Sequence, residues 1–351
     1  MTNNKFRDKT VDIAKGIGII LVILAHTLVA QEVNNLIYLF HMPLFFFISG
    51  ITAFYSCKEE KVSECIKKNA KSILIPYFVF SIIFFIYWFL IERKIRNQLN
   101  ISVLDNFFNI FIAKIDMELY SPNVVMWFLP CLFTTKVLFC LINKIKQGGV
   151  QAFAVLLSLI IGIVLSINNV ILPWGIETAL IALAFMYIAY KLKSEVKIEK
   201  ISTRVILNVI SIIGIIICML LNNEVDMLNH KYGNIILFFL GAFSGINLIL
   251  NLSKLISKNK PLTRILEYLG INSLMFMIFS EPIKRIIIKI VSIITKIDTD
   301  ILRANFLWSF LITIIVIITI MPVIYLLNRF IPIVIGKSKN KRKNQENMLN
   351  T

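Results

Sequence analysis

Charged residues are scarce in this chain of 351 residues, where they make up 16% of the sequence and only 20 are acidic. Long polar stretches are missing too, because apolar runs of about 20 residues, enough to cross a bilayer, recur from one end to the other. With 58% hydrophobic residues and a mean hydropathy of +0.80, the composition excludes an ordinary soluble globular protein. We therefore expect an all-α, polytopic integral membrane protein without a soluble domain.

Cysteine and histidine are rare as well. The five cysteines are Cys57, Cys65, Cys131, Cys140 and Cys218. They are odd in number and contain no CxxC pair, so we expect apolar core residues or reduced thiols rather than a disulfide framework. Of the three histidines, His26 and His41 lie in apolar runs and have no close third ligand in the sequence. We therefore predict no metal site.

Ten transmembrane helices are predicted, which puts both ends of the chain on one side of the membrane. Their ranges are 11–30, 35–56, 72–91, 124–142, 150–167, 171–190, 204–221, 233–250, 265–281 and 306–327. The first apolar run resembles a signal peptide, but a second run, LIYLFHMPLFFFISGITAFY, follows almost at once. The stretch LVAQ also lacks a small residue at the outer cleavage position, so we expect the first helix to be retained.

The net charge of +17 comes from 37 basic and 20 acidic residues, and its distribution predicts the orientation. Basic residues concentrate before the first helix, in every second loop and in the tail, whereas the loops QEVNN, INNV and NNEVDMLNHKY have hardly any. By the positive-inside rule, both termini are expected in the cytoplasm, and no nucleic-acid partner is indicated. We expect residues 1–335 to form the membrane domain and residues 336–351 a basic, disordered tail.

Two outer segments, 92–123 and 282–305, break this charge pattern because both carry basic residues. The second contains PIKRIIIKIVSIITKI, which spaces its charges like an amphipathic helix lying in the membrane interface. For each basic residue of the chain, an alternative is that it only sets topology and contacts lipid headgroups.

The segment DIAKGIGIILVILAHT, residues 12–27, places ionisable residues inside the first predicted span. At 100° per residue, Lys15 and His26 lie within about 20° of each other, and Asp12 lies about 40° to the other side of His26. The rise of the helix separates Lys15 from His26 by roughly 16 Å. One polar stripe therefore runs from the cytoplasmic end of this helix into its outer half. Ionisable groups are costly in a bilayer and commonly mark a functional path.

Four other residues are expected at a depth similar to that of His26. His41 lies just inside the second span, and Glu281 lies near the outer end of the ninth. Trp127 and Glu177 lie in the outer halves of their helices. We expect these side chains to face one outer cavity, where a histidine beside a carboxylate is a candidate general base.

Each of these residues also has a structural interpretation. A histidine on a helix is more often a hydrogen-bonded core residue than a catalyst, and Trp127 fits an aromatic-belt position as well as a substrate contact. Asp12 and Lys15, three residues apart, suit a simple interfacial salt bridge. His230 lies in a polar outer loop, where we expect it to be solvated.

A series of motifs along the chain follows the order seen in a known family. Asp12, then a basic residue with glycine, then His26 and FHMPLFFFISG form its beginning. The later motifs are KSILIPYFVF, WFLPCLF, LPWGIETALIALAFMYIAY and LGINSLMFMIF. Together they extend over nearly the whole chain and resemble membrane acyltransferase family 3, most closely its fucose 4-O-acetylase-like branch.

This resemblance implies a ten-helix bundle that transfers an acyl group, usually acetyl from acetyl-CoA, to a hydroxyl of a glycan or glycolipid on the extracytoplasmic side. The family's basic residue, often Arg, corresponds to Lys15, and its first-helix histidine corresponds to His26. Lys keeps the charge of Arg but cannot form the bidentate hydrogen bonds of a guanidinium group with a phosphate or carboxylate. Many relatives carry histidine in the segment where this chain has Ser280 and Glu281, which is a second departure.

The residues suit this chemistry. Acyl-CoA is a cytoplasmic polyanion, so Lys15 and Lys71 are expected to bind its nucleotide end. His26 is expected to act as a general base toward a sugar hydroxyl or to carry the acyl group itself. Glu177, which is expected to orient a histidine or bind hydroxyls, and Glu281 are the other candidate catalytic residues. The candidate substrate-binding residues are Asp12, His41, Trp127, Trp174 and Asn272. The expected partners are acyl-CoA, a glycan or lipid-linked sugar, and the lipids of the cell membrane.

Other functions are open from the residues alone. A transporter or flippase for a lipid-linked glycan or a small solute also uses a polar stripe across the bilayer, although such carriers commonly show inverted repeats and no repeat is visible here. A scaffolding subunit has no need of ionisable residues in its spans. The acyl group, the acceptor hydroxyl and the oligomeric state do not follow from the sequence.

Overall fold

The structure of the protein is a computed structural model that describes residues 8–27, 30–56, 61–114, 123–195 and 201–337. In these ranges the chain is almost entirely helical, with one isolated antiparallel bridge between Asp226 and Lys231. The elements are α1 (Lys9–Thr27), α2 (Gln31–Tyr38), α3 (His41–Ser56), α4 (Val62–Asn69), η1 (Ala70–Leu74), α5 (Ile75–Tyr87), η2 (Trp88–Glu92), α6 (Arg93–Ile95), α7 (Val103–Ile112), η3 (Val124–Trp127), α8 (Phe128–Ile142), α9 (Gly148–Ile167), η4 (Pro173–Gly175), α10 (Ile176–Glu195), α11 (Ile201–Leu221), α12 (Ile235–Ile256), α13 (Lys260–Ile271), α14 (Ser273–Thr295), α15 (Thr299–Ala304) and α16 (Phe306–Phe330). Most of the predicted disordered tail, residues 338–351, lies outside the described residues.

Nine segments among the described residues are long and apolar enough to cross a membrane. They are Lys9–Thr27, Gln31–Tyr55, Val62–Ile95, Val124–Ile142, Gly148–Ile167, Pro173–Lys193, Thr203–Leu221, Ile235–Ile256 and Phe306–Phe330. Each one overlaps a predicted span, so the prediction of an all-helical, multi-pass membrane bundle is confirmed. Helices are favoured here because a backbone in lipid must satisfy its hydrogen bonds internally.

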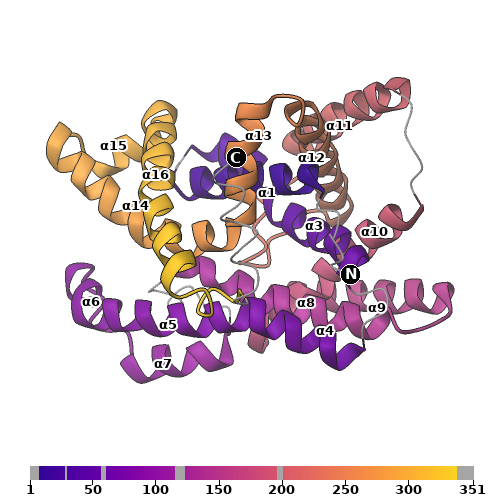
Figure 1. Ribbon diagram of the computed structural model, residues 1–351, viewed down its shortest axis with the longest axis horizontal. Helices are drawn as coiled ribbons and strands as arrows, with labels where there is room; N and C mark the ends of the chain where they lie inside the picture. The colour runs from indigo at the N-terminus through magenta and orange to yellow at the C-terminus, as the bar shows by residue number, and fades with distance from the viewer. Residues whose placement is uncertain (1–7, 28–29, 57–60, 115–122, 196–200, 338–351) are drawn as a thin grey trace.

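The predicted span at 265–281 is wrong as a single helix. α13 ends at Ile271, the buried Asn272 interrupts the helix, and α14 begins at Ser273. α13 packs so closely against α1 that a Cβ at Gly270 would overlap the backbone of Asp12. This contact keeps α13 alongside α1, and the chain changes direction at Asn272 before α14 packs against α15 and α16 (Figure 1).

The segment PIKRIIIKIVSIITKI does not form a separate helix, because α14 continues through Pro282 to Thr295. The expected place of this segment in the membrane interface stays a prediction. A proline has no N–H, so the carbonyl four residues earlier loses its helical partner. That carbonyl belongs to Ile278, and the side chain of Asn123 donates a hydrogen bond to it at 2.7 Å. Lys284, in the following turn, is buried inside the bundle.

The third long helix contains a π-helical turn, η1, directly before α5. Pro76 lies near the start of α5, and in a regular α-helix its ring would clash with the carbonyl of Ser72. A π-helical turn widens the helix locally and relieves such a clash. The C-terminal segment packs on this turn, since a Cβ at Gly336 would lie 2.7 Å from the Lys71 carbonyl.

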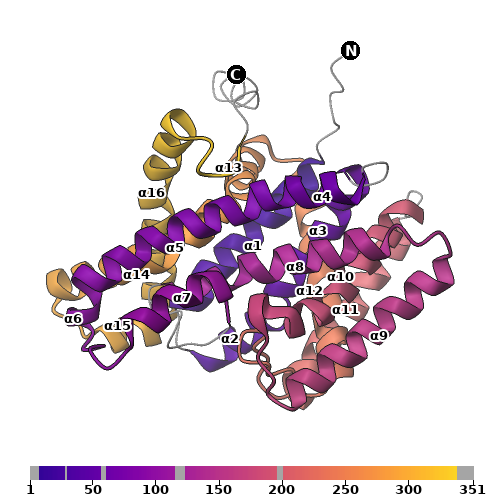
Figure 2. The ribbon, with the colours of Figure 1, turned by 90° about the horizontal axis from the view of Figure 1, so that it is seen from below.

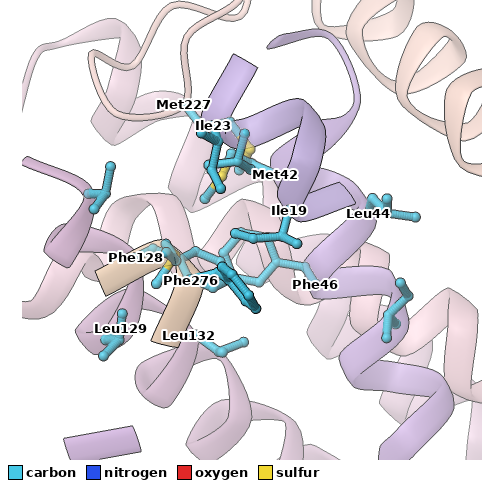
Figure 3. Packing of buried hydrophobic residues seen from close by; sticks show 14 of the residues in the cluster. Ile19, Ile23, Met42, Leu44, Phe46, Phe128, Leu129, Leu132, Met227 and Phe276 are labelled. Atoms are coloured by element: carbon cyan, nitrogen blue, oxygen red, sulfur yellow. The ribbon is translucent and has the colours of Figure 1, made fainter. Parts of the chain in front are cut away.

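α1 lies in the middle of the bundle, with α14 and α16 on one side and α3 and α12 on the other (Figure 1). The interior around it is filled by Ile19, Phe46, Phe128 and Phe276 (Figure 3). In Figure 2, α4 and α13 lie toward one end of the bundle, and α2 and α15 lie toward the opposite end. We call the end that holds α4 and α13, where α1 begins, the inner end. The end that holds α2 and α15, where α1 ends, is called the outer end.

The expectation for the cysteines is wrong for one pair. Cys65 in α4 and Cys140 in α8 form a disulfide, although they are 75 residues apart in the sequence. Packing of α4 against α8 brings the two together. Cys131 and Cys218 are buried free thiols, as expected, and Cys57 lies outside the described residues.

Candidate functional site

His26 lies half-buried in the last turn of α1, at the outer end of the bundle. The carbonyl groups of a last helical turn have no partner within the helix. Here Lys284 Nζ donates to the carbonyl of His26 at 2.8 Å, and Arg303 Nε donates to the carbonyl of Thr27 at 3.3 Å. Cations from α14 and α15 therefore hold the end of α1, where the helix dipole also favours positive charge.

Two aromatic contacts connect His26 with His41. The ring centroid of Tyr38 lies 6.3 Å from that of His26 and 4.9 Å from that of His41, edge-on in both cases. His41 is buried, and its Nδ1 donates to the carbonyl of Ile37 at 2.9 Å. Tyr38 is a candidate site residue that the sequence analysis missed. Its position three residues before His41, a helical spacing, was the available signal.

Glu281 is buried in α14 beside this end of α1. Its carboxylate accepts from Lys284 Nζ at 2.5 Å and from Arg285 Nε at 3.0 Å. Arg285 also donates to Glu92 at 2.7 Å, which connects α14 to η2. Buried charges are tolerated when they are paired and hydrogen-bonded in this way. Because both oxygens of Glu281 are engaged, this carboxylate acts on His26 through its charge and through Lys284.

Glu177 has a different partner. It is fully buried in α10, its Oε1 lies 3.1 Å from Nε2 of His230, and its Oε2 accepts from the backbone N–H of Leu172 at 3.1 Å. The histidine that Glu177 orients is therefore His230. Among the described residues, no hydrogen bond connects Glu177 to His26, with which it was expected to share one outer cavity. The expectation that His230 is solvated is wrong, since 5% of its side chain is exposed.

The loop 222–234 is folded so that His230 points inward. The backbones of Asp226 and Lys231 exchange two hydrogen bonds, at 2.7 and 2.9 Å, and the Asp226 carboxylate accepts from the N–H groups of Leu228 and Asn229. Burial raises the pKa of the Asp226 carboxyl, while the hydrogen bonds from Asn229 and Leu228 lower it. His230 has a φ of 56°, in the left-handed region that non-glycine residues seldom adopt. This built loop explains the burial that a polar sequence did not indicate.

At the inner end, Asp12 and Lys15 form a salt bridge of 3.5 Å, which their spacing allows. Lys71 is exposed on η1. The Oδ1 of the buried Asn272 accepts from Lys337 Nζ at 3.2 Å. Lys337 also donates to Asn328 at 2.7 Å, so the chain after α16 returns to the junction of α13 and α14. Lys337 and Asn328 are two inner-end residues that the sequence analysis did not select.

The two candidate tryptophans lie in other surroundings. Trp127 is buried before α8, with its ring against Phe128. Trp174 has a φ of 62°, and its Nε1–H donates to the carbonyl of Phe111 at 3.1 Å, which connects η4 to α7. Neither ring contacts the ring of His26 within the described part of the chain. Their assignment as substrate contacts stays a prediction.

The outer end of α1 offers acid–base chemistry. It holds a half-buried imidazole at His26, the phenol of Tyr38 and the cations Lys284 and Arg303. An imidazole can accept and return a proton, and neighbouring cations stabilise a developing negative charge. No three His, Cys, Asp or Glu side chains among the described residues come together as metal ligands.

Comparison with known proteins gives one finding. The sequence matches the family of the acyltransferase domain, acyltransferase family 3, over residues 8–327. The matched region begins directly before α1 and ends in α16, so it contains both the His26 cluster and the Glu177–His230 pair. Neither the curated proteins nor the solved structures contain a match.

Proposed function

Since the chain belongs to acyltransferase family 3 and is a membrane acyltransferase, we propose that it moves an acyl group, acetyl first of all, from acyl-CoA to a sugar hydroxyl. The acceptor is a cell-surface glycan or a glycolipid. We assign the chain to the fucose 4-O-acetylase-like branch because of the order of its motifs. We assign it to the cell membrane with both termini in the cytoplasm because of its basic inner loops. In this assignment α14, which leads from α13 at the inner end to α15 at the outer end, is the tenth crossing.

The observation that carries this proposal is the position of His26 on α1. The helix is unbroken from Lys9 to Thr27, so Lys15 near its inner end and His26 at its outer end share one face. Lys284 holds the carbonyl of His26 in place. A single rigid element therefore connects the side of a cytoplasmic donor with the side of an extracytoplasmic acceptor.

In the proposed reaction, the hydroxyl oxygen of the sugar attacks the carbonyl carbon of the thioester, and the imidazole of His26 takes the hydroxyl proton. The C–S bond then breaks, and coenzyme A leaves as a thiolate that receives this proton from the imidazolium. Lys284 and Arg303 favour the negative charge that develops on the carbonyl oxygen. In the alternative order, His26 accepts the acyl group first and passes it to the sugar.

The donor enters from the inner end in this proposal. Lys15 and Lys337 are half-buried there and Lys71 is exposed, and Lys337 is held between Asn272 and Asn328. Phosphate groups bind such cations through charge-assisted hydrogen bonds. These cations suit the polyanionic nucleotide end of acyl-CoA better than a small neutral solute.

Acyl transfer by membranes tests the proposal. Membranes that contain the protein or its His26→Ala variant receive labelled acetyl-CoA and the host's own surface polysaccharide or lipid-linked sugar. We expect the intact protein to incorporate label and His26→Ala to be at least about 100-fold slower. Equal amounts of both proteins in the membrane, with the same elution profile in detergent, control for insertion and folding. An unchanged rate in His26→Ala would remove His26 from the mechanism.

Two further measurements separate the alternatives. Label that stays on the protein without acceptor, and is absent from His26→Ala, indicates an acylated histidine. If no donor among acetyl-, succinyl- and longer acyl-CoA supports transfer to any acceptor, a transporter is favoured. Vesicle uptake of the lipid-linked sugar then tests that function directly.

A further inference from the structure

A pocket of about 500 Å³ opens at the outer end between the last turns of α9 and the loop 222–234. Pockets for small organic ligands commonly measure about 300–1,000 Å³. Its lining includes Ser166 of α9 together with His230 and Tyr232 of the loop, but neither His26 nor Tyr38. It is therefore a second site, separate from the cluster at the end of α1.

His230, which lines this pocket, is oriented by a buried carboxylate. Nε2 of His230 faces Oε1 of the buried Glu177 at 3.1 Å, and a carboxylate in this position accepts the Nε2–H. In the neutral form of the ring, this arrangement leaves a lone pair on Nδ1, which can accept a hydrogen bond from a hydroxyl group. Carboxylates that orient a histidine in this way are typical of sites where the imidazole binds a ligand or takes part in catalysis.

Two hydroxyl groups of the lining are only weakly hydrogen-bonded. Ser166 Oγ and Tyr232 Oη are buried near each other, Tyr232 also lies near Thr178, and neither oxygen makes a hydrogen bond of good geometry in the described part of the chain. A buried hydroxyl without a partner destabilises the folded state, so a native structure usually satisfies it. Both residues border the pocket, and a hydrogen bond from either oxygen to a ligand there requires a side-chain rotation of the kind common on binding. A ligand that carries hydroxyls would satisfy both groups.

The charges and the apolar walls narrow the chemistry of this ligand. At the rim, Lys231 and Glu224 form an ion pair of 3.0 Å, so the cation is neutralised and does not favour an anion. Ile163, Ile167 and Ile235 supply apolar surface. A neutral molecule with hydroxyls on its edges and C–H groups on its faces, such as a pyranose sugar, matches this combination.

We propose that this pocket is a carbohydrate-binding subsite in which one sugar unit of the acceptor hydrogen-bonds to His230, Tyr232 and Ser166. The proposal rests on the proposed function in one respect, namely that the sugar belongs to the acceptor. The loop 222–234 also carries Met227, which packs with Ile23 and Met42 beside the end of α1 (Figure 3). The same loop thus lies near both sites, and an acceptor long enough to reach both places one sugar unit in the pocket and another at His26.

Tyr232→Phe and Ser166→Ala are the decisive variants, because each removes a single oxygen that makes no hydrogen bond of good geometry in the free protein. Each is therefore expected to change the thermal stability of the purified full chain only slightly. The probe is a set of oligosaccharides released by mild acid from the surface polysaccharide of the cells that produce the protein. We expect each variant to bind these oligosaccharides about three- to tenfold more weakly, with the KM for acetyl-CoA unchanged. The control is Tyr325→Phe on α16, which removes an exposed hydroxyl that accepts from Arg329 and does not line the pocket, and this variant should bind like the unaltered protein.

Binding and transfer fail in distinguishable ways. Oligosaccharide binding that Tyr232→Phe weakens, in a protein that transfers no acetyl group, supports the subsite and contradicts the proposed function. Acetyl transfer with an unchanged acceptor KM in both variants, and unchanged binding, overturns the subsite and leaves the proposed function intact. The subsite is also overturned if Tyr325→Phe weakens oligosaccharide binding as much as Tyr232→Phe and Ser166→Ala do.

Discussion

Lys284 donates a hydrogen bond to the backbone carbonyl of His26, although the two residues are 258 positions apart in the sequence. The same ammonium group binds Glu281, so this carboxylate is connected to the candidate catalytic histidine by hydrogen bonds through a second side chain. We interpret Lys284 as a positioning residue that determines where α1 ends and therefore where the imidazole of His26 lies.

Replacing this lysine should lower turnover. In Lys284→Met, Glu281 keeps only the cation Arg285, and the His26 carbonyl loses its donor. We expect kcat to fall about 10- to 100-fold with little change in the KM for acetyl-CoA, because the group supports transition-state geometry and not donor binding. Lys284→Arg should recover part of the rate. Lys289→Met, an exposed lysine on the same helix, is the matched control. A kcat equal to that of the unaltered protein would contradict the assignment.

The hydrogen bond from Asn123 to the Ile278 carbonyl predicts a compensating pair of substitutions. Asn123→Ala removes the donor that replaces the missing N–H of Pro282, and should destabilise the protein by about 1–3 kcal/mol. In a Pro282→Ala background the N–H of residue 282 donates to the Ile278 carbonyl, so Asn123→Ala should destabilise the protein less. Thermal unfolding in detergent of the unaltered protein, the two single variants and the double variant gives the coupling free energy between the two substitutions. Strictly additive effects would mean that the asparagine does not serve this carbonyl.

The close contact between α1 and α13 predicts that Gly270 does not tolerate a side chain. A Cβ there would overlap the backbone of Asp12, so Gly270→Ala must separate the two helices and should destabilise the protein by about 1–3 kcal/mol or more. Gly149→Ala is the matched control, since a Cβ at Gly149 meets no atom within 4 Å. That change in α9 should be neutral or slightly stabilising. Equal melting temperatures for both variants would show that the contact is looser than described.

The inner-end cations predict a donor-specific defect. Lys15→Gln should raise the KM for acetyl-CoA about tenfold and leave the acceptor KM unchanged, because in the proposed function the ammonium group that pairs with Asp12 in the free protein binds the phosphates of the nucleotide. Lys15→Arg, which keeps the charge, should stay within about threefold of the unaltered protein. Raising the ionic strength should reduce the difference between Lys15→Gln and the unaltered protein. An increased KM for the acceptor, with an unchanged KM for acetyl-CoA, would contradict the assignment of Lys15 to donor binding.

The hydrophobic pattern alone predicted most of the fold. Apolar runs of spanning length coincide with the nine spans, and the shared face of Asp12, Lys15 and His26 follows from helical periodicity within α1. These features depend on neighbours in the sequence, since a helix in lipid satisfies its backbone within one segment. The predictions failed where a segment departs from the regular pattern because of a distant contact, as at Asn272 between α13 and α14.

The composition of the sites depended on the tertiary structure. The sequence by itself placed His26 on a polar stripe and made Glu177 and Glu281 candidates, but it did not reveal their partners. Glu177 pairs with His230, 53 residues away, and Glu281 pairs with Lys284 and Arg285 on its own helix. Periodicity determines which residues share a helix face, whereas only packing between helices decides which face meets which. A buried charge or hydroxyl takes its partner from whatever that packing brings within hydrogen-bond distance.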